Sequence, residues 1–307
     1  MKNVIITGVG GFLGGALAKK LLLDGYTVYG ITSSGHVGEL AQYPSFHSVQ
    51  ANFESYHQLH ELLPEIDFDM FYHFAWNGVY GDSFRAYELQ LNNAKYACAA
   101  LEEAKKVNCR RFIFAGTYNE FELLNFIGNE MFEPRYTCIY ATAKLTSELM
   151  CRTLAYQLGI EYSAGLVCMA YGERNYSPML ANIVLEQLLN GEEPKLISGE
   201  NYYDLVYVDD VAAAFQAIGE RGVNQKSYYV GHRKLKKFKD LFAEVRDIVN
   251  PSIQLRFGEY QDTSNLDYTK IDLDSLYRDT GFECKADLRE SILKTAQWLK
   301  KQENSHA

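Results

Sequence analysis

The predicted fold is decided by the stretch Val4-Ile5-Ile6-Thr7-Gly8-Val9-Gly10-Gly11-Phe12-Leu13-Gly14. A short apolar run typical of a β-strand leads directly into a glycine turn, and a helical pattern follows the turn. Gly8 lets the chain leave the strand, Gly11 lets the backbone approach an anion, and Gly14 lets the helix pack closely. The amide groups and the positive dipole end of the helix would face that anion. The stretch therefore predicts a dinucleotide site in which Gly8, Gly11, Phe12, Leu13 and Gly14 contact the cofactor; the alternative is a glycine-rich turn before an ordinary helix.

Composition bounds the class of protein. The chain has 307 residues, 47% of them hydrophobic, and a formal net charge of -9. That charge disfavours a nucleic-acid partner, because phosphate binding relies on a basic face. The six cysteines form no Cys-x-x-Cys pair, and no site for a metal is expected. We expect no signal peptide, no membrane contact and a cytoplasmic location.

Strand and helix patterns alternate over the first half of the chain. Further strands are expected at 26–31, 46–51, 70–75, 111–115 and 160–168, with long helices at 83–106 and 138–157. Such alternation predicts an α/β fold with a doubly wound, Rossmann-type parallel sheet. After residue 170 the pattern is less regular, although strand and helix patterns continue.

The end of the second strand bears on the choice of dinucleotide. NAD enzymes of this architecture commonly carry an acidic residue here to hold the ribose hydroxyls. This chain has Thr32, Ser33 and Ser34 instead. These hydroxyls would accept a 2′-phosphate that a carboxylate would repel, so NADP is slightly favoured over NAD, although no arginine supports this preference. The alternative is a plain polar loop.

A second chemical pattern lies in the helix at 138–157. Tyr140 and Lys144 are four residues apart, which places the phenol and the ammonium group on one helix face. A nearby cation favours the phenolate and would lower the pKa of the tyrosine, making it a better acid or base. Thr117 stands at the end of the preceding strand. Alone, this spacing also fits an ordinary surface pair.

The glycine turn, Thr117, Tyr140 and Lys144 occur in an order that resembles the extended short-chain dehydrogenase/reductase family, over most of the chain. The resemblance implies that Thr117 binds the substrate oxygen, Tyr140 transfers a proton, and Lys144 binds the nicotinamide ribose. Hydride would move between the nicotinamide and a sugar carbon. The resemblance implies further cofactor contacts, from Asn52, Phe53, Phe74, Ala75, Trp76, Asn92 and Ala115.

Relatives that share the later half of this pattern mostly act on nucleotide-diphosphate sugars. The resemblance thus implies a dinucleotide-binding domain at 1–170, to which later strands at about 200–232 return, and a smaller substrate-binding lobe mainly at 171–307. The expected substrate contacts are Trp76, Thr117, Tyr118, Asn119, Arg174, Tyr203 and Arg256. Related enzymes often have an arginine where this chain has Tyr203, so Arg174 or Arg256 would have to supply the charge.

The residues after Thr117 bear on the reaction. Dehydratases of this type usually place an acid within two positions, whereas here Tyr118 and Asn119 follow and Glu120 comes third. The run 116–121 is more similar to that of some nucleotide-sugar 4-ketoreductases than to that of many epimerases. We therefore expect reduction of a 4-keto-6-deoxy sugar.

Two alternatives stay open at this point. One is a 4-epimerase that retains NAD, and the other is a non-catalytic dinucleotide sensor or scaffold. The helices at 83–106 and 138–157 correspond to those that pair in many relatives, which predicts a homodimer.

Overall fold

A seven-stranded parallel sheet forms the centre of the computed structural model, which describes residues 2–127, 134–135, 137–264 and 266–306. The strand order is β11-β6-β5-β4-β1-β2-β3, and every neighbouring pair is parallel. The strands are β1 Asn3–Thr7, β2 Thr27–Thr32, β3 Phe46–Gln50, β4 Phe68–His73, β5 Cys109–Thr117, β6 Glu161–Val167 and β11 Lys226–Val230. This is the doubly wound Rossmann-type sheet predicted from the sequence.

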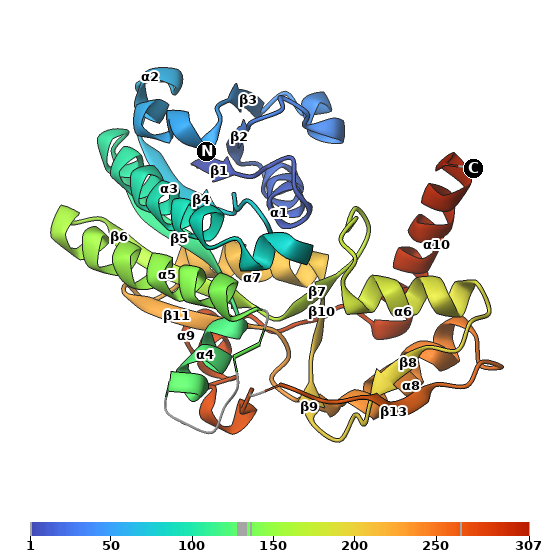
Figure 1. Cartoon of the computed structure of the whole chain (residues 1–307). Coiled ribbons are helices and arrows are strands. Elements are labelled where there is room, and N and C mark those ends of the chain that lie inside the picture. Colours follow the sequence, from blue (N-terminus) through green and yellow to red (C-terminus); the bar gives the residue numbers. More distant parts are fainter. Residues whose placement is uncertain (1, 128–133, 136, 265, 307) are drawn as a thin grey trace.

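Helices cover both faces of this sheet (Figure 1). One face packs against α1 (Phe12–Leu23) and α7 (Val208–Arg221), and the other against α3 (Tyr87–Lys106) and α5 (Cys138–Leu158). Along β1, the side chains of Val4 and Ile6 enter the first core and that of Ile5 enters the second. This alternation explains why the strand is apolar at every position.

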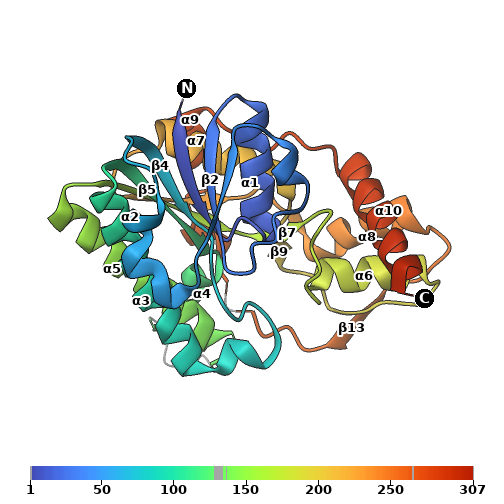
Figure 2. The same cartoon turned by 90° about the horizontal axis from the view of Figure 1, so that it is seen from above.

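A second lobe lies to one side of the sheet (Figure 2). Its own apolar core includes Tyr171, Leu185, Phe238 and Phe242. Its elements are β7 Met169–Tyr171, α6 Leu180–Leu189, β8 Lys195–Ile197, β9 Tyr202–Tyr203, β10 Leu205–Tyr207, β12 Lys236–Lys237, α8 Phe238–Val249, β13 Arg256–Tyr260 and α10 Leu288–His306. The chain thus leaves the main sheet after β6, builds much of this lobe, and returns to the sheet through β11.

The remaining elements are short, and most of them pack against the strands and helices of the main sheet. They are α2 Leu59–Leu62, α4 Asn119–Ile127, α9 Ser275–Thr280 and the short 3-10 helices η1 Gly38–Gln42, η2 Phe53–Gln58, η3 Gly81–Arg85 and η4 Tyr268–Lys270. Within the described ranges, no helix combines the length and the apolar character needed to cross a bilayer.

Two sequence expectations need correction. The helix expected at 83–106 is interrupted, because Ala86 leaves the helical conformation with ψ at 85° between η3 and α3. The helix α4 begins at Asn119, only two residues after Thr117, where the sequence pattern predicts no helix. Only Tyr118 separates it from the strand, so no turn signal marks its start.

Candidate active site

A cleft of about 1290 Å³ opens between the carboxyl ends of the central strands and the second lobe. Ligands of open α/β sheets bind at this edge. Three groups of residues line it: the glycine turn with the end of β5 and the start of α5, the segment after β6, and parts of the second lobe. Of the predicted residues, the cleft collects Gly8, Gly11, Phe12, Leu13, Gly14, Phe74, Trp76, Ala115, Thr117, Tyr118, Asn119, Tyr140, Lys144, Arg174 and Tyr203.

The glycine turn forms the backbone wall of the cleft. Gly8 has a φ of 72°, and a Cβ atom there would lie 2.8 Å from the amide nitrogen of Ala75. A Cβ atom on Gly14 would lie 2.4 Å from the carbonyl oxygen of Gly8. Gly11 caps α1 without a side-chain hydrogen bond, and the first turn of α1 carries no acidic residue. The turn therefore leaves amide groups and a positive helix end for an anion, which fits the pyrophosphate of a dinucleotide.

The loop after β2 folds back onto this turn. A Cβ atom on Gly10 would lie 2.8 Å from the carbonyl oxygen of His36. The hydroxyl groups of Thr32 and Ser34 lie 3.4 Å apart, and the amide of His36 donates to Ser34 Oγ at 3.2 Å. Ser33 is exposed. These hydroxyls stand beside the glycine turn but outside the residues that line the cleft.

The residues that follow β3 and β4 differ in whether they reach the cleft. The Asn52 side chain caps η2 by accepting from Ser55, and the ring of Phe53 stacks on Tyr96 at 5.1 Å. Asn52 and Phe53 do not line the cleft. The ring of Phe74 does, and it packs against Phe215 with the centroids 4.6 Å apart.

Buried hydrogen bonds behind the cleft fix the end of β4. The Thr7 hydroxyl lies 3.0 Å from His73 Nδ1 and accepts from the amide of Ala75 at 3.2 Å. Burial lowers the pKa of His73 to about 3, so its imidazole is neutral. His73 is thus a core histidine that holds the turn toward Trp76.

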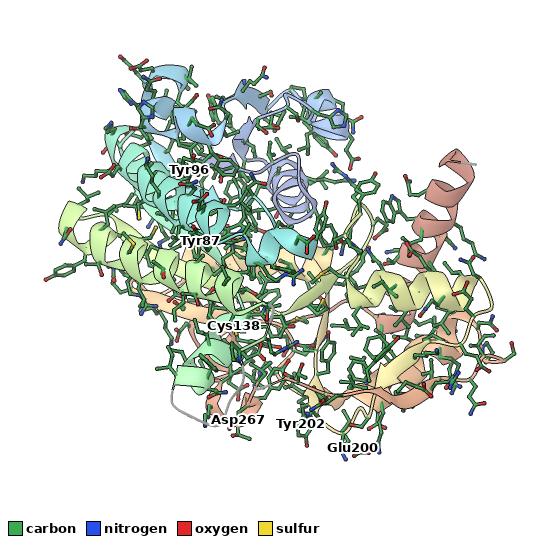
Figure 3. The ribbon with its side chains drawn as sticks, in the orientation of Figure 1. Tyr87, Tyr96, Cys138, Glu200, Tyr202 and Asp267 are labelled. Carbon is green, nitrogen blue, oxygen red and sulfur yellow. The ribbon has the colours of Figure 1, made fainter. Side chains whose placement is uncertain are left out.

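Thr117, Tyr140 and Lys144 converge on the floor of the cleft. Cys138, labelled in Figure 3, marks the start of α5, and Tyr140 and Lys144 follow it on this helix. Tyr140 hydrogen-bonds with the Thr117 side chain, and its ring packs edge-on against Phe84 at 4.9 Å and Trp76 at 6.1 Å. The catalytic hydroxyls predicted from the sequence are therefore adjacent.

The Lys144 ammonium group is buried in an aromatic and carbonyl setting. Nζ donates to the carbonyl oxygen of Ala115 at 2.8 Å and lies 3.7 Å from the centroid of the Trp76 ring. Burial lowers the pKa of Lys144 to about 7, while the nearby Glu120 carboxyl raises it. The Trp76 indole donates in turn to Gln90 Oε1 at 2.9 Å, which holds the ring in place.

The expected effect of Lys144 on Tyr140 is not found. Burial raises the pKa of Tyr140 above its ordinary value, and the contact with Thr117 only partly opposes this. The ammonium group lies 6.0 Å from the centroid of the tyrosine ring, directed instead at Ala115 and Trp76. Tyr140 is therefore a protonated phenol at neutral pH.

Two expected contacts, Asn92 and Arg256, lie elsewhere. Asn92 is exposed on α3, whereas its neighbour Asn93 is buried and bonds both the amide and the carbonyl group of Asn77. At this turn of α3 it is therefore Asn93, and not Asn92, that points into the protein. Arg256 is exposed on β13, pairs with Glu259 at 2.7 Å and does not line the cleft.

Arg174 lines the cleft on the cofactor side. It has a φ of 69°, and its guanidinium Nη1 lies 3.8 Å from Glu39. A Cβ atom on Gly15 of α1 would lie 3.5 Å from the same nitrogen. Arg174 thus stands over the first turns of α1.

The sequence did not single out Arg135 or Tyr268, which also line the cleft. Arg135 pairs with Glu122 at 2.6 Å, and its charge partly opposes the effect of burial, which raises the pKa of Tyr203. Tyr118 and Tyr268 also raise the pKa of Tyr203 through their charge. Arg135 therefore lies near the position where related enzymes often have an arginine. No periodic pattern marks these residues, because each belongs to a different loop or short element.

Similarity to known proteins agrees with this geometry. The chain is 24% identical over 315 residues to a trifunctional UDP-glucose 4,6-dehydratase/UDP-4-keto-6-deoxy-D-glucose 3,5-epimerase/UDP-4-keto-L-rhamnose-reductase of Arabidopsis thaliana, covering 97% of this chain and 47% of that one. It is 25% identical over 268 residues to CDP-abequose synthase of Yersinia pseudotuberculosis, covering 84% and 89%. The chain spans about half the length of the plant relatives it matches.

Solved structures give the same fold. The UDP-glucuronic acid 4-epimerase of Bacillus cereus, in complex with UDP-glucuronic acid and NAD, has a TM-score of 0.77 at 19% identity, covering 98% of this chain and 100% of that chain. The sequence profile of the NAD dependent epimerase/dehydratase family matches residues 4–231. With its glycine turn and its Thr117, Tyr140 and Lys144 in one cleft, the chain belongs to this family of extended short-chain dehydrogenases/reductases.

Proposed function

We propose that this protein reduces the 4-keto group of a nucleotide-diphosphate 6-deoxy sugar. The observation that carries the proposal is the convergence of Thr117, a protonated Tyr140 and Lys144 beside the glycine turn. Reduction needs a proton donor at the carbonyl oxygen, and a buried neutral phenol suits that task. A bound nicotinamide dinucleotide would supply the hydride.

Each residue has a distinct task in this mechanism. The Thr117 hydroxyl binds the keto oxygen, and the Tyr140 hydroxyl beside it donates the proton as the oxygen gains charge. Lys144 presents a cation on the cofactor side, held by Ala115 and Trp76. The glycine turn and the α1 N-terminus bind the pyrophosphate.

Dehydration is disfavoured by the position of the available acid. Tyr118 and Asn119 line the cleft, but Glu120 is buried behind the strand end and is not among the lining residues. An acid in that position does not reach the C6 hydroxyl of a bound sugar.

A 4-epimerase is the second candidate, because structural neighbours such as the Bacillus cereus enzyme are 4-epimerases. Epimerisation also ends in a reduction step that needs a proton donor, so a protonated Tyr140 fits both reactions. The choice of reduction rests on the run 116–121, which begins at the end of β5.

NADP is the proposed cofactor, because the hydroxyl groups of Thr32 and Ser34 lie beside the glycine turn and could bind a 2′-phosphate. Ser34→Asp tests this choice. It should weaken NADPH binding by about tenfold relative to NADH, because a carboxylate repels a 2′-phosphate. An unchanged ratio of the two affinities would show that this loop does not select the cofactor.

Identification of any retained dinucleotide tests the proposed reaction. The protein is denatured, and released dinucleotide is identified by mass spectrometry; the native protein is then assayed with nucleotide 4-keto-6-deoxy sugars and NADPH. An empty site and consumption of NADPH in proportion to product support the reductase. Stoichiometric retained NAD and product formed without consumption point to the epimerase, and binding without turnover across the panel to the sensor or scaffold.

We also propose a homodimer through α3 and α5, which lie side by side (Figures 1 and 3). Both helices expose large apolar side chains, among them Tyr87, Leu91, Leu149, Met150 and Tyr156. Leu149→Asp with Met150→Asp should convert a dimer to a monomer in light scattering. A wild-type monomer would refute the proposal.

A further inference from the structure

A pair of buried carboxyl groups lies behind the proposed catalytic residues. Glu120, from α4, is 1% exposed, and Glu148, from α5, is 4% exposed. Burial and, next to it, the neighbouring Glu148 carboxyl raise the pKa of Glu120 well above its ordinary value. Two neighbouring buried carboxylates repel each other strongly unless a proton lies between them.

The partners of each group indicate where that proton is held. Glu148 Oε1 accepts from Arg152 Nη2 and from Ser227 Oγ, both at 2.6 Å, so a cation and a hydroxyl group already donate to this oxygen. Glu120 Oε1 accepts from the amide of Thr117 at 2.7 Å. Among the described residues, no N–H or O–H donor reaches the buried Glu120 Oε2. A proton on Oε2, donated to Glu148, satisfies both groups.

A glycine next to Glu120 leaves space for the carboxyl group of this residue. A Cβ atom on Gly116 would lie 2.6 Å from Glu120 Oε1, so only glycine leaves room for this carboxyl group. Gly116, Thr117 and Glu120 thus act as one unit that fixes the backbone of the catalytic threonine. Tyr140, Lys144, Glu148 and Arg152 follow at intervals of four along α5, which places the pair directly beyond Lys144.

We propose that Glu120 and Glu148 share one proton, and that the single negative charge of this pair keeps Lys144 cationic while Glu120 positions Thr117. Both are positioning residues, because neither lines the cleft. The proposal rests on the proposed function only in giving Lys144 a catalytic role. The burial and the contacts of the pair stand without it.

Other groups around Lys144 do not change charge near neutral pH. They are Tyr140 on α5, His73 on β4 and Tyr162 on β6; burial raises the pKa of the two tyrosines and lowers that of the histidine to about 3. Arg152, beyond Glu148, is permanently charged. The Glu120 carboxyl is therefore the charged neighbour that raises the pKa of Lys144, against the larger lowering effect of burial.

The fluorescence of Trp76 offers a readout that needs no turnover, because Lys144 Nζ lies 3.7 Å from its ring centroid. The protein has two tryptophans, so a Trp298→Phe background isolates Trp76. In that background, the fluorescence is titrated with pH for the unchanged protein, Glu120→Gln, Glu148→Gln and the double variant. In each single variant, one glutamine stands beside one ionised glutamate. The pair then carries one negative charge, as it does in the wild type if the two glutamates share one proton.

Each single amide variant should therefore keep the wild-type midpoint, and the double variant should lower it by about one pH unit or more. A midpoint lowered as far by Glu120→Gln alone would overturn the proposal, because both groups would then be ionised. A midpoint unchanged in the double variant would also overturn it, because the pair would then not act on Lys144.

Infrared difference spectroscopy tests the shared proton even where the double variant does not fold. The wild type minus Glu120→Gln spectrum should contain the carbonyl stretch of one protonated carboxylic acid at neutral pH. Its absence would contradict the proposal. The basic limb of the kcat/KM profile should follow the fluorescence midpoints. The protein could reduce no sugar while the fluorescence midpoints of all variants agree with the expectation. That result would refute the proposed function and still support the shared proton of Glu120 and Glu148.

Discussion

The two walls of the cleft are built in different ways. The glycine turn presents backbone, and its close contacts, such as the 2.4 Å between a Cβ on Gly14 and the Gly8 carbonyl oxygen, exclude any larger residue. The opposite wall presents side chains from separate segments, including Arg135, Tyr203 and Tyr268. Under the proposed function, the first wall binds the part that all dinucleotides share, and the second wall binds the substrate. Substitutions in the two walls should therefore differ in kind.

The largest effect is expected between the walls, at the proton donor. Tyr140→Phe should lower kcat by about a thousandfold, because the phenol supplies the proton, while dinucleotide affinity stays the same. Steady-state kinetics and a cofactor titration measure the two quantities. Tyr277→Phe is the matched control, because Tyr277 is exposed on α9 and does not line the cleft. A kcat within tenfold of wild type would mean that another group is the acid.

The backbone wall should tolerate no added methyl group. Gly14→Ala should weaken dinucleotide binding by about 10- to 100-fold, because the helix must move away from the turn to relieve the clash. Fluorescence titration with NADPH measures the affinity. Gly25→Ala is the control: its Cβ would meet nothing within 4 Å, and its φ of 82° costs about 1 kcal/mol in stability alone. Equal affinity losses in both variants would remove the special role of the turn.

The activity should depend on pH through Lys144. Burial lowers its pKa to about 7, so the cation is present below that pH and is lost above it. We expect kcat/KM to be level below about pH 7 and to fall by about tenfold per unit above it. A profile that stays level to pH 9 would show that the charge on Lys144 is not required.

Substitutions in the side-chain wall should change the KM for the nucleotide sugar. Arg135→Gln should raise the KM for the nucleotide sugar by about tenfold with little change in kcat, because a charged hydrogen bond to the diphosphate is lost. Arg256→Gln is the control, since Arg256 is exposed and outside the cleft. If Arg256→Gln has the larger effect, the diphosphate lies along β13 instead.

The same difference between the walls explains what the sequence predicts. Gly8, Gly11 and Gly14 form a local pattern whose spacing itself carries the geometry, and Tyr140 and Lys144 share one helix face. The doubly wound sheet follows from the alternation of strands and helices. Arg135 and Tyr268 meet Tyr203 only through the fold, from positions far apart in the chain, and no local pattern marks them.

For Asn92 and Tyr140, helical spacing predicts the helix but not the surroundings of the side chain. Helical spacing leaves the register of α3 open by one residue, and the structure places Asn93 inward. The i,i+4 spacing places Lys144 near Tyr140, but the direction of the ammonium group depends on Ala115 in β5 and on Trp76 in the segment after β4. The pKa of Tyr140 is therefore set by burial, a property that spacing does not contain.

The most direct test of the central claim is a single-turnover reaction with NADPH deuterated at C4 of the nicotinamide and a nucleotide 4-keto-6-deoxy sugar. The wild-type protein should place one deuterium at C4 of the product for each NADPH consumed. The Tyr140→Phe variant should not form this product. Product that forms without consumption of NADPH would contradict the central claim.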